Sequence, residues 1–160
     1  MKLYAWVENE QLFTTEDKNL APSNAIELEV ESPDNVVYEN GQIRLKTKEE
    51  KLAEEKERKL AELKNHTTSL LEQTDYIITK IAEAQLLGDT DKAERLKQKY
   101  AKQLQEREAI RQWNEQMKEA IRNAKTLDEL RQIEIRYVKE LQLLSLTSRT
   151  SKKRCKKHDC

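Results

Sequence analysis

The sequence predicts a mainly α-helical protein with a small β-rich segment at its N-terminus. Between Lys46 and Leu146 the chain has no proline and a single glycine, Gly88, and these are the residue types that most strongly interrupt helices. Leucine, isoleucine, alanine and tyrosine recur there every three or four positions, which is the spacing of one helix face. Such a thin, highly charged helical arm is suited to holding partners or spacing them apart, and rarely to chemistry.

Composition agrees with an extended rather than a globular molecule. Of the 160 residues, 36% are apolar and 38% are charged, so a thick hydrophobic core is not expected. Burial should therefore come from hairpin packing or from other chains. Acidic and basic residues number 30 each, which leaves no net charge to attract nucleic acid. No apolar run is long enough for a signal peptide or a membrane span, and we expect a soluble protein on the cytoplasmic side.

Three parts are expected along the chain: a small β-rich docking segment over 1–46, a helical arm over 47–146 and a disordered basic tail over 147–160. In the first part, the pair Asn40-Gly41 between two apolar runs is a strong signal for a β-hairpin. We expect a β-meander of three or four strands that is marginally stable alone and docks on the helices or on a neighbour. Its predicted packing residues are Trp6, Phe13, Ile26, Leu28, Val37 and Ile43.

Capping signals divide the arm into helices. The first is expected from about Lys48 to Glu72, and Thr74 offers an N-cap for a second helix that ends at Gly88. A long third helix follows, and Thr126 to Glu129 has the spacing of a capping box. Because the apolar spacing continues across Thr74, the pattern leaves open whether the first two helices are separate or continuous. The predicted fourth helix carries the regular stripe Leu130, Ile133, Tyr137, Leu141 and Leu144.

The apolar stripes of these helices suit a coiled-coil seam as well as an intrachain hairpin. Stripes this long on helices this charged predict self-association or a bound partner, and we expect a homo-oligomer or a clasp around another protein. Trp113 and Tyr100 could form an exposed contact patch, although their helical spacing favours the core. The residues predicted to form the protein interface are Leu60, Leu63, Ile77, Ile81, Leu96, Tyr100, Ile110, Met117, Leu130, Ile133, Tyr137 and Leu141.

The tail holds both cysteines of the chain, so no disulfide framework is predicted. Cys155, His158 and Cys160 have zinc-binding chemistry, but a structural site needs four ligands, and the other histidine, His66, lies far away in the first helix. We therefore expect a solvated tail and no metal. No glycine-rich phosphate loop is present and neither histidine lies beside a credible nucleophile, so we expect no enzyme activity, no catalytic residue and no cofactor.

A composite pattern in the arm consists of Leu70 to Tyr76, Lys80, Glu83-Ala84, Gly88, Arg107-Glu108, Arg111 and Asn114-Glu115. It resembles the helical C-terminal region of small tail and tail-fibre-associated proteins of tailed bacteriophages. The resemblance covers roughly Leu63 to Glu119. In that family a Thr-Asp-Tyr entry leads a short helix, a glycine ends it, and a helix with Arg-x-x-Arg-x-x-Asn spacing follows. The family's proline-containing connector after the glycine is replaced here by Asp89-Thr90-Asp91-Lys92.

The resemblance implies a structural or assembly protein of a phage tail or tail fibre, located in the virion tail or in the host cytoplasm during assembly. Its implied partners are other tail or fibre proteins, with no membrane, and with nucleic acid not expected. The alternative is a cytoplasmic coiled-coil protein that binds nucleic acid or an acidic partner through its basic C-terminal tail. Between Thr147 and Cys160 this tail contains six basic residues and one aspartate.

Overall fold

The protein is mainly α-helical with a small antiparallel sheet at its N-terminus, as the sequence predicts. The structure, a computed structural model, describes residues 1–138. The chain divides into two compact units, of which the first is Met1–Glu55 and the second begins at Lys56. The boundary falls inside the first helix of the arm, beyond the predicted 46–47 junction. The first turns of that helix form ion pairs with the β-rich segment, between Glu50 and Arg44, Glu54 and Lys46, and Lys51 and Glu31.

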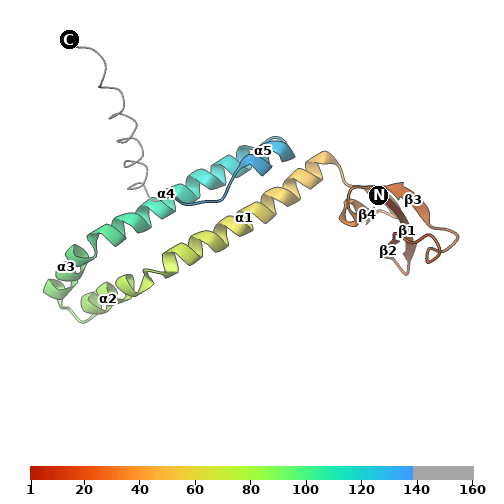
Figure 1. Ribbon diagram of the computed structural model, residues 1–160. Coiled ribbons are helices and arrows are strands. Elements are labelled where there is room, and N and C mark those ends of the chain that lie inside the picture. Colours follow the sequence, from red (N-terminus) through yellow and green to blue (C-terminus); the bar gives the residue numbers. More distant parts are fainter. Residues whose placement is uncertain (139–160) are drawn as a thin grey trace, which may run out of the picture. The chain divides into compact units, whose positions relative to one another are not determined.

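The N-terminal unit begins with a three-stranded antiparallel sheet (Figure 1). Strand β1 (Lys2–Glu8) lies between β2 (Gln11–Thr15) and β3 (Ile26–Glu29). The tight turn from β1 to β2 uses Asn9 and Glu10, whose φ angles of 51° and 61° are those of a two-residue hairpin turn. The sequence analysis did not single out this turn, because glutamate is an unusual residue at a positive φ.

A second hairpin pairs β4 (Val36–Glu39) with β5 (Gln42–Leu45). Asn40 and Gly41 form its turn with φ angles of 53° and 78°, which confirms the hairpin predicted from this pair. A short 3-10 helix, Pro33–Asn35, leads into the hairpin, and the Ser32 hydroxyl accepts a hydrogen bond from the Asp34 amide at its start.

The core of the N-terminal unit differs from the predicted one. Leu3, Ala5, Val30 and Val36 are buried, and Leu12, Leu28 and Ile43 pack against them. Of the six predicted packing residues, only Leu28 and Ile43 belong to this cluster. Side chains alternate across a strand, so once Leu3 and Ala5 face the core, Trp6 must lie on the opposite face. The prediction was wrong for β1 because it placed the bulkier Trp6 in the core instead of Leu3 and Ala5.

The remaining predicted packing residues lie outside that cluster. Phe13, which is 39% exposed, pairs with Trp6 and shares its outer face. Ile26, which is 41% exposed, is the first residue of β3. Val37 is partly buried but pairs with Arg44, on the face opposite to Val36. Large apolar side chains are therefore left at the surface of the small sheet.

Helix α1 (Lys48–Glu72) has the bounds that the sequence predicted. A capping box starts it: the Thr47 hydroxyl accepts from the Glu50 amide at 3.2 Å, and the Glu50 carboxylate accepts from the Thr47 amide at 3.2 Å. Arg44 on β5 donates to both Glu50 carboxylate oxygens, at 2.8 and 2.9 Å, and to Glu39 at 2.6 Å. These bonds attach the second hairpin to the first turn of the helix.

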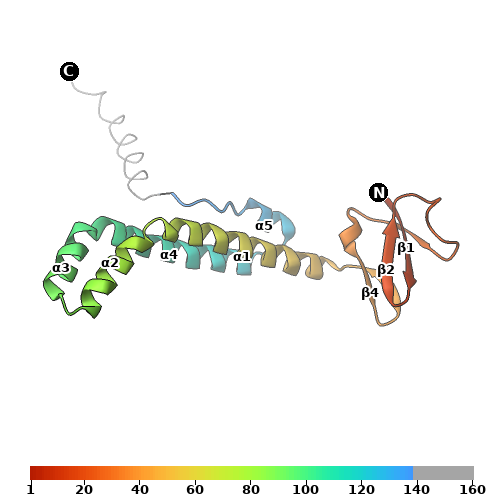
Figure 2. The ribbon, with the colours of Figure 1, turned by 90° about the horizontal axis from the view of Figure 1, so that it is seen from below.

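The second unit is a helical hairpin whose two limbs run antiparallel (Figures 1 and 2). Its helices are α1, α2 (Asp75–Leu86), α3 (Thr90–Lys99) and α4 (Ala101–Asn123). Near the open end the Lys56 ammonium donates to the Arg122 carbonyl at 2.7 Å, and further along the Thr67 hydroxyl donates to Asn114 Oδ1 at 2.9 Å. The intrachain hairpin is thus the observed alternative, and a coiled coil between chains is not shown.

Helix α2 is separate from α1, which settles the question that the sequence left open. Thr74 precedes α2 but makes no side-chain capping bond to it. Gly88, with φ of 73°, follows the helix as expected, and the Asp89 carboxylate caps α3 by accepting from the Lys92 amide at 3.0 Å.

The long third helix of the prediction is interrupted at Tyr100, where φ and ψ are −105° and 20°. Neither proline nor glycine marks this point. The Tyr100 ring contacts Tyr76 edge-on at 6.0 Å, so the bend lies opposite the break between α1 and α2.

The predicted fourth helix is much shorter than expected. Helix α5 (Leu127–Gln132) starts at Thr126, whose hydroxyl accepts from the Glu129 amide at 3.1 Å. It ends at Gln132, so the prediction of helix through Ile133 and Tyr137 is wrong. From residue 133 to 138 the side chains alternate between partly buried and exposed, as in an extended segment, and this segment runs back along α4 (Figure 2). Leu141 and Leu144 lie outside the described residues.

Replacing Leu130 should test how α5 contributes to stability. Leu130 is fully buried, so Leu130→Ala should lower the free energy of unfolding by about 2–5 kcal/mol, measured by urea denaturation. Leu86→Ala is the matched control: Leu86 is 87% exposed, and its truncation should change stability by no more than about 0.5 kcal/mol. Equal effects of the two substitutions would contradict the packing of α5.

The Glu50 carboxylate should make stability sensitive to acid. Hydrogen bonds from Arg44 hold the pKa of Glu50 below its ordinary value. The folded state therefore gains stability from ionised Glu50 above the ordinary carboxyl pKa, and loses it as pH falls through the lowered value. Glu50→Gln should destabilise the protein at pH 7 and weaken its loss of stability between about pH 5 and pH 3, followed by circular dichroism melts.

Glu49→Gln is the control, since it removes a carboxylate from the same helical turn without touching Arg44. It should keep the acid response of the parent. If Glu50→Gln retains that response in full, the bonds from Arg44 do not stabilise the protein.

Candidate functional site

The hairpin brings most of the predicted interface residues together within one chain. Five are buried there: Leu63, Ile77, Ile81, Ile110 and Leu130. Another six are partly buried, namely Leu60, Leu96, Tyr100, Met117, Ile133 and Tyr137, and Leu141 lies outside the described residues. The stripes are therefore largely covered by the chain's own helices, and a contact with another chain has only their margins to use.

Arg107 crosses the hairpin at the break between α1 and α2. It is 6% exposed, and its Nη1 donates to the Leu71 carbonyl at 2.7 Å and to the Thr74 hydroxyl at 2.8 Å. Its Nη2 lies 2.8 Å from Asp75 Oδ1, while Nε has no partner among the described residues. A guanidinium thus satisfies the last turn of α1 and ties it to the first turn of α2.

Several residues of the sequence pattern noted between Leu63 and Glu119 meet at these crossing points. Thr74 and Asp75 come from the Thr-Asp-Tyr entry, and Arg107 and Asn114 come from the later helix; Arg107 joins the first two, and Asn114 accepts from Thr67. Beside Asn114, the Trp113 ring packs edge-on against His66 at 5.9 Å and Tyr137 at 5.4 Å. The motif therefore has a structural use in fixing the register of the hairpin.

The outer face of the N-terminal sheet presents an uncommon apolar surface. Trp6 on β1 and Phe13 on β2 are directly paired, and their rings stack with centroids 5.7 Å apart and an interplanar angle of 19°. Tyr4 shares this face because it lies two residues from Trp6. Phe13 is exposed, whereas Tyr4 and Trp6 are partly buried. Partly exposed aromatic side chains of this size indicate a binding surface more often than a scattered leucine does. We call Tyr4, Trp6 and Phe13 the aromatic face.

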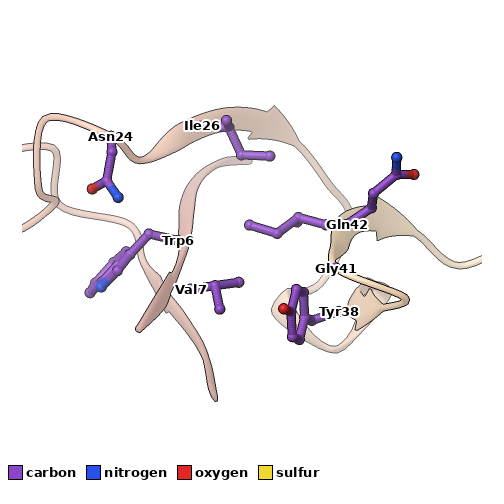
Figure 3. Close-up of a pocket in the computed structure, with 8 residues that line it drawn as sticks. Trp6, Val7, Asn24, Ile26, Tyr38, Gly41 and Gln42 are labelled. Carbon is purple, nitrogen blue, oxygen red and sulfur yellow. The ribbon is translucent and has the colours of Figure 1, made fainter. Parts of the chain in front are cut away.

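A hollow of about 440 Å³ lies between β1, the start of β3 and the second hairpin (Figure 3). Val7, Ile26 and Tyr38 surround it, together with Ile43 from β5. Trp6 and Asn24 also line this hollow, and their side chains lie next to each other at one side of it (Figure 3). The hollow is open and shallow in shape, so it suits a protruding side chain better than an enclosed small molecule.

A second hollow, of about 530 Å³, lies beside Trp6 itself. The loop between β2 and β3 forms one wall with Leu20, Ala21, Pro22 and Asn24, and β1 forms the other with Trp6, Val7 and Glu8. We call this the Trp6 groove. One carboxylate, that of Glu8, lines it, and no ion pair of Glu8 is present in the part of the chain that the structure describes.

The segment of the chain that carries the aromatic face is strongly acidic. The stretch from Met1 to Glu31 contains seven carboxylate side chains and two lysines. Lys2 is already paired with Glu27 at 2.6 Å. Hydrogen bonding to Glu27 raises the pKa of Lys2, while the same contact lowers the pKa of Glu27. The carboxylates are Glu8, Glu10, Glu16, Asp17, Glu27, Glu29 and Glu31.

The described residues contain neither a candidate metal site nor a candidate membrane span. No cluster of three or more metal-ligating side chains occurs among residues 1–138, and no helix in that range is long and apolar enough to cross a membrane. Cys155, His158, Cys160 and the basic tail over 147–160 lie outside the range described.

Comparison with known proteins adds no relative. No family model, no curated protein and no solved structure matches this chain at a significant level.

Removing the Arg107 side chain should destabilise the hairpin. Arg107→Ala leaves the Leu71 carbonyl and the Thr74 hydroxyl without their charged donor and opens a cavity, so unfolding free energy should fall by about 2–4 kcal/mol in urea denaturation. Arg111→Ala is the control, because Arg111 is exposed and forms only a surface pair with Glu108 at 3.5 Å. Its loss should cost less than about 1 kcal/mol, and comparable losses would show that Arg107 is not special.

Proposed function

We propose that the protein is a structural or assembly protein of a bacteriophage tail or tail fibre, acting by binding and not by catalysis. In this proposal the N-terminal unit docks on a tail or fibre component, and the helical hairpin holds or spaces the parts that it joins. The protein would work in the virion tail or in the host cytoplasm during assembly. Two supports come from different parts of the chain.

The observation that carries the proposal is the contrast between the two units. The arm buries Leu63, Ile77 and Ile110 within the chain, whereas the small sheet leaves Trp6 and Phe13 partly exposed at its outer face. A sheet this small gains stability when a partner covers such a face, at about 25 cal/mol for each Å² of apolar surface removed from water. This is the arrangement that a docking unit on a spacer arm requires.

The resemblance over Leu63 to Glu119 supplies the second support. Its Thr-Asp element is joined across the hairpin to Arg107 and its Asn114 to Thr67, which gives the spacing of these residues a physical reason in this chain. A homo-oligomer also belongs to the proposal. It would use exposed apolar side chains on α2, namely Tyr76 and Ile78, together with the partly buried margins of the stripes.

The proposal is tested in the phage that encodes the chain. Mass spectrometry of purified virions and of tail-assembly intermediates should find the protein in at least one of the two. Replacing both Trp6 and Phe13 with alanine should then reduce its co-purification with tail or fibre proteins by about tenfold or more, because the aromatic face is lost.

The matched control is the pair Leu86→Ala and Leu87→Ala, which removes a similar amount of exposed apolar surface from the tip of the arm. It should leave co-purification through the N-terminal unit intact. Absence of the protein from both preparations, together with normal particle formation after deletion of its gene, would refute the proposal.

A further inference from the structure

We propose that the Trp6 groove binds a basic side chain, preferentially arginine, on a positively charged segment of the docking partner. The inference rests on the docking role proposed above and names the chemistry of the contact. Three observations on the first unit carry it: a partly exposed indole, a neighbouring carboxylate without an ion pair among residues 1–138, and a large excess of acidic side chains.

The aromatic part of the groove is already ordered. Phe13 stacks on the Trp6 ring and fixes its position, and the groove opens beside the same indole between β1 and the loop that carries Leu20 and Pro22. The face of an indole carries a negative quadrupole, which attracts a guanidinium or an ammonium group. Because the ring is held by Phe13, little side-chain freedom is lost when the cation binds.

The charged part of the groove is Glu8. Its side chain lines the groove and has no ion pair with any described residue, although Lys2 and Lys18 belong to the same segment. A bound cation would therefore meet a carboxylate that has no competing partner. The Asn24 amide, which lies next to Trp6, supplies a neutral acceptor on the opposite wall (Figure 3).

The charge of the whole segment decides the sign of the partner. Seven carboxylates against two lysines repel an anionic partner and attract a cationic one over several ångströms. A neutral carbohydrate would also stack on Trp6, but it would make no use of this excess of negative charge. Arginine is favoured over lysine because its planar guanidinium stacks on the ring while it donates in its own plane to a carboxylate and an amide oxygen.

The test uses the full-length, nitrogen-15-labelled protein and three short peptides of equal length. In one peptide arginine alternates with serine; in the others lysine or citrulline replaces arginine, and citrulline keeps the shape of arginine without its charge. The chain has two tryptophans, so its NMR spectrum has two indole signals, which the Trp6→Phe variant assigns. Trp113, packed between His66 and Tyr137 in the arm, serves as the internal reference.

The arginine peptide should shift the Trp6 indole signal saturably and leave that of Trp113 unchanged. The citrulline peptide should bind at least about tenfold more weakly, with lysine in between. Binding should weaken as salt is raised, because the contact is between exposed charges. Equal binding of the arginine and citrulline peptides, or no shift at Trp6, would overturn the inference. Tighter binding of a neutral oligosaccharide than of the arginine peptide would overturn it too.

Variants locate the contact. Glu8→Gln should weaken the arginine peptide several-fold while the amide signals of Leu3 and Ala5 stay in place, which shows that the sheet is intact. Glu119→Gln, an exposed carboxylate on α4, removes the same charge from the arm and should have no effect. If both variants weaken binding equally, the groove is not the site. If the peptide binds but the protein is absent from virions and assembly intermediates and deletion of its gene leaves particle formation normal, only the tail function is refuted. If the protein is present in either preparation but the arginine peptide does not bind, only the groove is refuted.

Discussion

The structure depends on one chain burying its own apolar stripe. The antiparallel pairing of α1 with α4 places Leu63, Ile110 and Ile121 in the interior of a hairpin that is only two helices thick. A bundle of that thickness has little interior and much surface, which accounts for a composition in which charged residues outnumber apolar ones. The few polar groups inside therefore matter for specificity, since apolar contacts alone would tolerate a slip of one helix along the other.

Register is set by Arg107 and by the contact between Thr67 and Asn114. Each of these bonds forms at one alignment of the two limbs, and a slip by a helical turn would leave the guanidinium buried without acceptors. The same Arg107 explains why α1 stops at Glu72 although the apolar spacing continues through Thr74. Once a guanidinium from the other limb satisfies the Leu71 carbonyl, the chain has an alternative to an unbroken helix at that point.

Local signals in the sequence predicted the parts of the fold that local physics controls. The bounds of α1, the Asn40-Gly41 turn and the Thr126 cap follow from hydrogen bonds between residues no more than a few positions apart. The end of α5 was missed although a signal was present. Ile133, Ile135 and Tyr137 alternate with Glu134 and Arg136, a period of two that indicates an extended segment, but the spacing of Leu130 and Ile133 was given more weight.

Other features depend on tertiary context that the sequence alone does not reveal. The bend at Tyr100 has no proline or glycine to announce it, and it arises opposite a break in the other limb. The orientation of β1 was equally hidden, because either Leu3 and Ala5 or Tyr4 and Trp6 could have faced inward. The pairing of β1 with two strands and the burial of Val30 and Val36 decided it. The candidate site was missed for the same reason, since Trp6 and Phe13 were assigned to the interior.

The order of contacts along the hairpin favours a direction of folding. Helices α2 and α3 are joined by a turn of three residues at Gly88, so they meet after closing a very short loop. Moving away from that turn, the bridging contacts join residues 33, then 47, then 66 positions apart. Each contact that forms shortens the free chain that the next one must close, which reduces its entropic cost. The hairpin is therefore built to zip from its turn toward its open end, and α5 completes the interior only after α4 is in place.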